Sequence, residues 1–181
     1  IIKHLEDCDA FMWHYNHNLP QDILFAKQLL FSLEQSGKVV YPDFNSGWHF
    51  NDKLGQKYLL EALKLPLIPT YVFFSAEDAF NWAKNYNFPA VFKLRSGAGS
   101  CNVKLIRTTK EALRIIEKAF SKGFRQVDTF NDIKDTYKKY LKHQKQLRDL
   151  LKSFVHIVYP YKVEKIFGRE KGYVYFQEFI P

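Results

Sequence analysis

The sequence predicts an α/β fold in two parts, and three observations lead to this prediction. Short apolar runs typical of strands alternate with segments whose apolar residues recur every three or four positions, as on one face of a helix. Ser, Thr or Asp stands where several of these helices would begin, and prolines and glycines separate the elements. The 181 residues, 46% of them hydrophobic and 17% aromatic, suffice for a packed core in one domain or two small ones.

The first part, residues 1–68, is predicted to contain a parallel β-α-β unit followed by a further helix. Apolar runs at 9–15 and 39–41 indicate two strands. The segment 20–37 between them begins with a proline, carries apolar residues at helical spacing and ends on a glycine, as helices do. Asp52 then stands at the start of a second amphipathic helix. Two strands joined through a helix favour a parallel sheet.

The second part, residues 69–181, begins after a linker bracketed by Pro66 and Pro69, where we place a domain boundary. Ser75 and Thr108 each stand three residues before an acidic residue and ahead of apolar residues at helical spacing, the pattern of a capping box. We therefore expect a helix after each of them. The strands expected in this part are 70–74, 90–94, 103–106, 155–159, 161–167 and 173–180.

A basic segment at 131–153 is expected to form one long helix inserted into the second part. The chain carries a net charge of +8, and its basic residues concentrate between Lys134 and Lys152, with only Asp135 and Asp149 against them. We interpret this run as a solvated helix face. A nucleic-acid-binding module and a helix that docks on an acidic protein are the two alternative functions for such a face.

The composition also excludes several classes of protein. No run of about 18 apolar residues exists that could span a membrane, and the chain does not open with the apolar stretch of a secretory signal. Cys8 and Cys101 stand far apart and form neither a metal-binding spacing nor a disulfide framework. We therefore expect a cytoplasmic protein that does not act at a membrane.

Lys93 carries the clearest functional prediction. It lies near the end of an apolar strand that runs directly into the glycine-rich loop 95–102. A lysine among apolar residues is stabilised when an anion meets it, and consecutive N–H groups of a glycine-rich turn suit phosphate oxygens. The segment therefore indicates a phosphate site, and the alternative is a hairpin whose lysine reaches water. Alternation along the strand places Lys93 on the face opposite to Ala90, Phe92 and Leu94.

Two further segments fit the same kind of ligand. Lys53 stands in the first turn of a predicted helix, where its charge opposes the helix dipole unless an anion also lies there. The alternative is a surface lysine balanced by Asp52. The segment 177–180, Gln-Glu-Phe-Ile, offers a carbonyl and an N–H group at the spacing that an adenine needs, beside apolar side chains. The alternative for it is an ordinary buried strand.

The order of these segments resembles the ATP-grasp superfamily, and most closely its glutamate-ligase-like branch. No single motif is specific to this superfamily, but the order of the motifs is. The ordered set consists of a lysine at the start of a helix, a strand lysine followed by a Gly/Ser-rich loop, and a Gln-Glu-Phe-Ile hinge. Leu94 departs from the pattern, since the family usually has proline there. The segments that carry the resemblance are 50–53 with 65–70, 88–93 with 96–100, and 175–180, within residues 38–124 and 160–181.

The resemblance implies a fold for both parts of the chain. Residues 1–68 would be part of a Rossmann-like domain that precedes the ATP-grasp domain. Residues 69–181 would be the N-terminal, lid-bearing half of the ATP-grasp domain, with the basic segment 131–153 as a helical insertion. In that fold Lys53 and Lys93 would contact the phosphates of ATP.

The other nucleotide contacts that the resemblance implies come from the loop and the hinge. Backbone N–H groups of the loop would cap the β- and γ-phosphates as a lid. The loop residues in question are Ser96, Gly97, Ala98, Gly99 and Ser100. At the hinge, the Gln177 carbonyl and the Ile180 N–H group would hold the adenine edge beside Phe179. Glu178 would reach the ribose or the lid.

The implied activity is ATP-dependent ligation. ATP would phosphorylate a carboxylate substrate, and an amine or thiol acceptor would then displace phosphate from the acyl-phosphate. ATP and Mg²⁺ would be the cofactors, and nucleic acid is not expected as a partner. The magnesium ligands and the substrate-reading arginine of the family are expected beyond residue 181. We therefore expect no catalytic residue within this chain and no activity of the chain alone.

Overall fold

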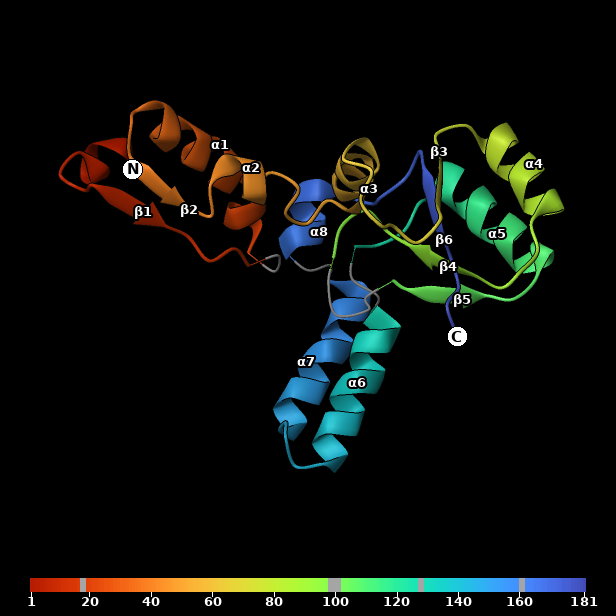
Figure 1. Ribbon diagram of the computed structural model, residues 1–181. Helices are drawn as coiled ribbons and strands as arrows, with labels where there is room; N and C mark the ends of the chain where they lie inside the picture. The colour runs from red at the N-terminus through yellow and green to blue at the C-terminus, as the bar shows by residue number, and fades with distance from the viewer. Residues whose placement is uncertain (17–18, 98–101, 127–128, 160–161) are drawn as a thin grey trace.

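The computed structural model describes residues 1–16, 19–97, 102–126, 129–159 and 162–181. Within these residues the chain forms two separate sheets, each with helices beside it, and a pair of helices that projects away from both sheets (Figure 1). Helices and strands are mixed along the whole chain. The predicted α/β class is therefore confirmed.

The smaller sheet is a parallel β-α-β unit. Strand β1 (Ala10–Met12) pairs with β2 (Val39–Tyr41), and helix α1 (Pro20–Gln35) connects them. The strand predicted over 9–15 is shorter in the structure. The 3₁₀-helix η1 (Ile2–Leu5) and the short α2 (Phe44–Gly47) lie near this sheet, and α3 (Lys53–Ala62) lies between the two sheets (Figure 1).

The larger sheet has four antiparallel strands in the order β3-β6-β4-β5. These strands are β3 (Thr70–Phe73), β4 (Ala90–Lys93), β5 (Lys104–Ile106) and β6 (Val174–Glu178). Helices α4 (Ala76–Asn85) and α5 (Thr109–Phe120) begin at the predicted capping residues: Ser75 Oγ accepts from the Asp78 N–H group (3.3 Å) and Thr108 Oγ1 from the Glu111 N–H group (3.2 Å).

One face of the larger sheet carries the main core of the chain. Phe92 on β4 and Phe176 on β6 are almost completely buried beneath α4 and α5, together with Ile116 from α5. The Trp82 ring of α4 stacks on the Phe176 ring with 4.8 Å between centroids. Since β4 and β6 are the two central strands, this packing fixes the position of the residues on their opposite face.

The prediction of a single helix at 131–153 is wrong, because the chain reverses within that segment. It forms α6 (Thr129–Leu141) and α7 (Leu147–Val158), which pack against each other as a hairpin. His143 in the turn has a positive φ of 55°, and the Gln146 N–H group donates to Asp149 Oδ2 (3.1 Å) to start α7. Acidic Asp149 therefore begins a helix, a role that the charge pattern of the segment did not reveal.

The strands predicted at 155–159 and 161–167 are also wrong. The first is the end of α7, and most of the second is the short helix α8 (Lys162–Phe167). Both segments are rich in β-branched and aromatic residues, which favour strands in isolation. In the structure, helical hydrogen bonds run through both segments instead, and the buried Glu164 of α8 pairs with Arg125, with 2.7 Å between Oε2 and Nη2.

The basic side chains of the segment 131–153 are spread over the α6–α7 hairpin. Most of them are exposed, as expected for a solvated face: Lys134, Lys138, Lys139, Lys142, Arg148 and Lys152. Lys145 is half-buried and donates to Thr136 Oγ1 (3.2 Å). In Figure 1 the hairpin of α6 and α7 projects away from the two sheets.

Candidate functional site

Lys93 and Gln177 lie on the face of the larger sheet that is opposite to the aromatic core. In the pairing of β4 with β6, Lys93 stands opposite Tyr175, and Val91 stands opposite Gln177. Lys93 Nζ donates to Gln177 Oε1 (2.5 Å), and Gln177 Nε2 donates to Thr70 Oγ1 on β3 (3.1 Å). A polar row therefore crosses three neighbouring strands, and Lys93 stands on the face that its alternation predicted.

The ammonium group of Lys93 has an unusual environment. Burial lowers its pKa from the ordinary value of a lysine. Among the described residues, the ion pairs do not include Lys93, and its hydrogen bond goes to a neutral amide. A half-buried cation of this kind is stabilised when an anion comes within reach, because the anion offsets the lost hydration.

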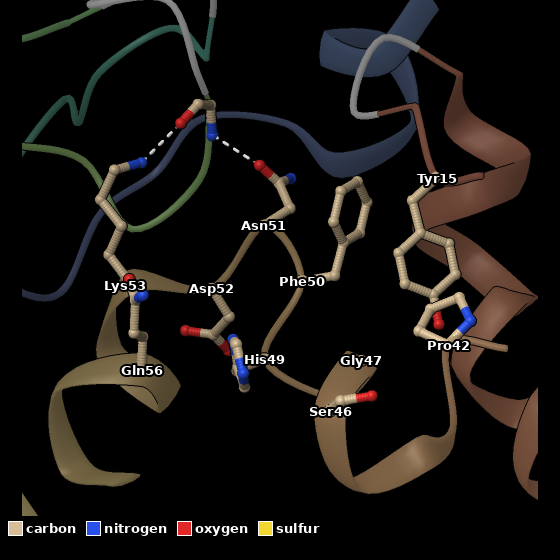
Figure 2. A pocket seen from close by; sticks show the side chains of 11 residues that line it. Tyr15, Pro42, Ser46, Gly47, His49, Phe50, Asn51, Asp52, Lys53 and Gln56 are labelled. Atoms are coloured by element: carbon tan, nitrogen blue, oxygen red, sulfur yellow. Dashed lines mark hydrogen bonds between the residues drawn. The ribbon is translucent and has the colours of Figure 1, made fainter. Parts of the chain in front are cut away.

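Lys53 holds the start of the glycine-rich loop. Its Nζ donates to the carbonyls of Ser96 (3.2 Å) and Gly97 (2.5 Å), and its backbone N–H group donates to Arg95 O (3.0 Å). The Gly97 N–H group donates in turn to Asn51 Oδ1 (2.7 Å), as Figure 2 shows. The structure therefore brings the helix-start lysine to the loop that follows the strand lysine, although the two lie far apart in sequence.

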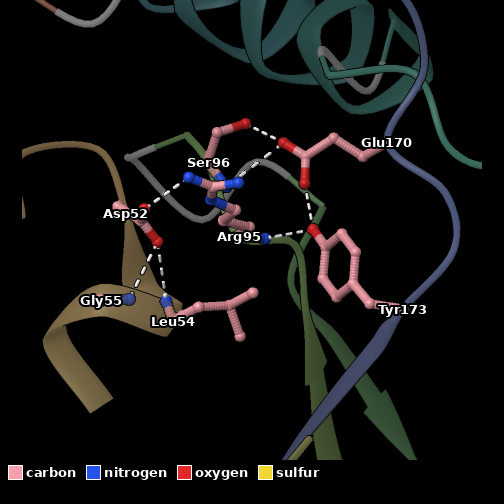
Figure 3. Close-up of polar contacts among 7 residues, drawn as sticks. All are labelled: Asp52, Leu54, Gly55, Arg95, Ser96, Glu170 and Tyr173. Atoms are coloured by element: carbon pink, nitrogen blue, oxygen red, sulfur yellow. Dashed lines mark hydrogen bonds and ion pairs between the residues drawn. The ribbon is translucent and has the colours of Figure 1, made fainter. Parts of the chain in front are cut away.

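Asp52 and Arg95 join the same two segments by charge. Asp52 Oδ1 accepts from the N–H groups of Leu54 (3.1 Å) and Gly55 (2.9 Å), and Oδ2 accepts from Arg95 Nη2 (2.6 Å; Figure 3). Burial opposes the ionisation of Asp52. The hydrogen bonds from Arg95 and Gly55 and the charges of Arg95 and Lys27 outweigh it and hold the pKa of Asp52 below its ordinary value. The capped helix thus begins beside the loop.

Glu170 binds the other side of the loop, a contact that was not among the sequence predictions. Its carboxylate accepts from the Ser96 N–H group (3.2 Å), from the Ser96 hydroxyl and from the Tyr173 hydroxyl (Figure 3). The Arg95 N–H group donates to the Tyr173 hydroxyl (2.6 Å). Burial, followed by the charge of Glu170, raises the pKa of Tyr173. No local pattern distinguished Glu170, because it lies in a predicted turn.

The described residues include only part of the loop 96–100, which was predicted to bind phosphates. The N–H groups of Ser96 and Gly97 donate to the side chains of Glu170 and Asn51 in this structure. The remaining predicted loop residues, Ala98, Gly99 and Ser100, lie outside the described residues. The two described N–H groups thus both have side-chain oxygens as partners, one of them a carboxylate.

The predicted adenine segment forms the end of β6 and the residues after it. The Glu178 N–H group donates to Pro69 O (2.9 Å), which ties this end to the start of β3. Gln177 is buried, whereas Ile180 is 62% exposed and Phe179 36% exposed. The two apolar side chains are thus open on at least one side, as an apolar wall for a ligand must be.

A pocket of about 410 Å³ opens beside Lys53 (Figure 2). Tyr15 lines it, and the hydroxyl group of this residue is buried without a hydrogen-bond partner among the described residues. A Cβ atom at Gly47 would lie 2.6 Å from the Tyr15 hydroxyl oxygen, so a larger residue at this position would displace the Tyr15 side chain. The remaining lining residues are Pro42, Ser46, His49, Phe50, Asn51, Asp52, Gln56 and Gly97. The pocket can thus hold a small polar molecule next to a lysine.

The described part of the chain lacks two other kinds of feature. No group of three or more His, Cys, Asp or Glu side chains comes together there in a way that could hold a metal ion. No helix among the same residues is long and apolar enough to cross a membrane.

Comparison with known proteins shows similarity at the level of fold. The sequence matches no protein-family model, and no curated protein resembles it in sequence. N5-carboxyaminoimidazole ribonucleotide synthetase from Thermus thermophilus superimposes on 99% of this chain with a TM-score of 0.51 and 17% identity. A RimK domain protein ATP-grasp from Sphaerobacter thermophilus DSM 20745 covers 86% of the chain, with a TM-score of 0.46 and 18% identity.

A third similar structure is the biotin carboxylase domain of Hydrogenobacter thermophilus 2-oxoglutarate carboxylase, in complex with MgADP, ADP and bicarbonate. It covers 95% of this chain, with a TM-score of 0.48 and 15% identity. The chain spans only part of each of these proteins: 32% of the synthetase, 42% of the RimK domain protein and 28% of the biotin carboxylase domain. The chain therefore shares its fold with part of the ribonucleotide synthetase, in agreement with the kind of fold that the resemblance predicted.

Proposed function

We propose that this chain, since its fold is that of part of an ATP-grasp enzyme, is the nucleotide-binding portion of an ATP-dependent carboxylate–amine or carboxylate–thiol ligase. The observation that carries the proposal is the environment of Lys93. Its half-buried ammonium group contacts a neutral amide, stands at the end of β4, and precedes the loop that Lys53 holds. A phosphate chain laid along the loop would supply the missing anion.

The proposed roles of the individual residues follow from their positions. Lys93 and Lys53 bind the phosphates of ATP and offset the charge that develops on the transferred phosphoryl group. The loop 96–100 covers the β- and γ-phosphates. The segment 177–180 binds the adenine, with a carbonyl and an N–H group at its edge and Phe179 as one wall.

Binding of phosphates in this way requires an exchange of partners at the loop. The Ser96 N–H group now donates to Glu170, and the Gly97 N–H group donates to Asn51. We propose that phosphate oxygens take over these two donors and that the Lys53 ammonium turns from the loop carbonyls to the phosphates. Each lost hydrogen bond is then replaced by one to a more highly charged acceptor.

The pocket beside Lys53 is the proposed place for the carboxylate substrate. It adjoins the cation that would bind the transferred phosphoryl group, and Tyr15, whose buried hydroxyl has no partner among the described residues, lines it. The reaction transfers the γ-phosphoryl group to the carboxylate, and the acceptor then displaces phosphate. We also propose that residues 1–68 and 69–181 are separate domains and that the protein is cytoplasmic.

The proposal is tested by measuring thermal stability and ADP formation of the full gene product with and without Mg-ATP. Ligand at about 100 times its dissociation constant should add roughly 2.7 kcal/mol of stability. Lys93→Met keeps the aliphatic stem and removes the charge, so it should abolish this shift and leave the unliganded protein folded. Lys84→Met, a change at the end of α4 outside the proposed site, should leave the shift unchanged.

Two results would contradict the proposal. The first is a full product that is folded and shows no shift with Mg-ATP. The second is a Lys93→Met variant that keeps both the shift and ADP formation. In the first case, a salt-sensitive affinity for single-stranded oligonucleotides would favour the alternative in which the basic α6–α7 hairpin binds nucleic acid.

A further inference from the structure

A second pocket, of about 780 Å³, lies on the helix-covered side of the larger sheet. In the pairing of β4 with β5, Phe92 stands opposite Lys104, so both side chains are on the face that α5 covers, and Lys93 is on the other. This pocket is therefore separate from the nucleotide site proposed above. Its lining residues are Phe92, Asn102, Val103, Lys104, Glu111, Arg114, Ile115, Lys118, Phe124, Arg125, Thr129, Ile157 and Arg169.

The charge of this pocket is strongly unbalanced. Five of its lining residues are cationic and one, Glu111, is acidic. Glu111 Oε2 already accepts from the Arg107 N–H group (2.8 Å), and Arg125 is balanced by Glu164. Among the described residues, no ion pair includes the other four cations: Lys104, Arg114, Lys118 and Arg169. Like charges gathered in this way repel one another, and a bound anion would relieve the repulsion.

The floor of the pocket is aromatic. The rings of Phe92 and Phe124 lie side by side with 4.8 Å between their centroids. Lys118 Nζ stands over the Phe124 ring at 4.6 Å from its centroid, which places one cation of the rim directly beside the apolar floor. A flat apolar group could cover the floor while an attached anionic group reaches the rim. The volume falls in the range of roughly 300–1,000 Å³ that is typical of pockets for small molecules.

Thr129 provides an independent indication of a ligand. Its side chain lines the pocket and is 5% exposed, and its hydroxyl group has no hydrogen-bond partner among the described residues. An unpartnered buried hydroxyl costs free energy, and a ligand oxygen in the pocket would satisfy it. A polar group that could hydrogen-bond to a ligand therefore belongs to a residue that lines this basic pocket.

We propose that this pocket is a second ligand site, which binds a small organic phosphate. The apolar part of the ligand lies on Phe92 and Phe124, its phosphate contacts Arg114 and Lys118 one turn apart on α5, and Thr129 donates to one of its oxygens. The concave shape favours a small molecule over a nucleic acid strand, whose backbone needs an extended basic groove. This inference does not depend on the proposed ATP-dependent activity.

The experiment uses 2-naphthyl phosphate as the probe and measures its affinity for the full chain by calorimetry in low salt. Wild-type protein should bind it more tightly than either 2-naphthol or inorganic phosphate, since the site needs both parts of the ligand. The double variant Arg114→Gln/Lys118→Gln should lose about tenfold or more in affinity, about 1.4 kcal/mol, because it removes both cations that contact the phosphate. Thr129→Val should weaken binding severalfold at an equal or higher melting temperature.

A matched control separates the site from general electrostatics. Lys110→Gln/Lys122→Gln removes the same charge at and just after the ends of α5 from exposed side chains that do not line the pocket, and it should leave the affinity unchanged. Equal losses in both double variants, or equal binding of an oligonucleotide, would overturn the proposal in favour of a diffuse basic surface. Unchanged binding in Arg114→Gln/Lys118→Gln, or loss of binding in Lys93→Met, would overturn it as well.

Discussion

The two sheets of this chain bury their apolar residues to very different extents. In the four-stranded sheet, Ala90, Val174 and Phe176 are completely buried under α4 and α5. In the two-stranded sheet, the middle residue of each strand is only half-buried, and Met12 and Val39 on the other face are 75% and 69% exposed. Two strands beside one helix therefore bury less of their apolar surface than four strands beneath two helices. The larger sheet is therefore the rigid frame on which the candidate site is built.

The difference also separates the two lysines of the candidate site. Lys93 belongs to the rigid frame, since its strand is central in the larger sheet. Lys53 belongs to α3, and Asn51, Asp52 and its own hydrogen bonds connect it to the loop. The position of Lys53 relative to Lys93 thus depends on a few polar contacts rather than on core packing. Substitutions in the two regions should therefore have effects of very different size.

The largest loss of stability is expected for a substitution in the core of the larger sheet. Phe176→Ala removes a fully buried ring that stacks on Trp82, so it should lower the free energy of unfolding by about 3–5 kcal/mol. Urea unfolding followed by circular dichroism measures this change. A loss below about 1 kcal/mol would show that the sheet relaxes around the cavity and is not the rigid frame.

The second largest loss of stability is expected for Asp52, which connects the start of α3 to Arg95 just after β4. Asp52→Ala removes the cap of α3 and the partner of Arg95, so it should cost about 1–2 kcal/mol, mostly through the cap. If this connection couples the parts, the variant should unfold in two separable steps where the wild type unfolds in one. A single unchanged transition in both proteins would contradict that coupling. Asp78→Ala, in the first turn of α4, is the matched control.

The stability that Asp52 contributes is expected to depend on pH. The folded-state pKa of Asp52 lies below its ordinary value, so the unfolded chain binds the proton more readily than the folded one. The stabilisation is therefore present above a pH of about 4, the usual carboxyl range, and is lost as the pH falls through the lower, folded-state value. Melting temperatures between pH 6 and pH 3 should fall less in Asp52→Asn than in the wild type. Parallel curves for the two proteins would exclude Asp52 as the titrating group.

The smallest change in stability is expected for a substitution in the smaller sheet. Val39→Thr replaces an exposed side chain by one of similar shape and β-propensity, so it should change the free energy of unfolding by less than about 0.5 kcal/mol. The same urea experiment measures it beside Phe176→Ala. A loss comparable with that of the core variant would show that another molecule or segment covers this face.

The sequence by itself determined the parts of the protein that depend on local pattern. Helical spacing and capping residues predicted α1, α3, α4 and α5, because the buried face and the first hydrogen bonds of a helix depend on residues that are close in sequence. Alternation placed Lys93 on the face opposite to Phe92, because side chains change sides at every residue of a strand. The ordered motifs predicted a fold with which the similarity to the ribonucleotide synthetase agrees.

Only the tertiary structure decided the contacts between segments distant in sequence. Glu170 binds Ser96, and Asp52 binds Arg95. These contacts depend on which distant segments the fold places beside the loop, and no local sequence pattern predicts that. The segment 155–159 became helix rather than strand because it continues α7 in the hairpin with α6, where packing outweighs the strand preference of its residues. Both pockets likewise form where segments far apart in sequence meet, so their residues came together only in the folded chain.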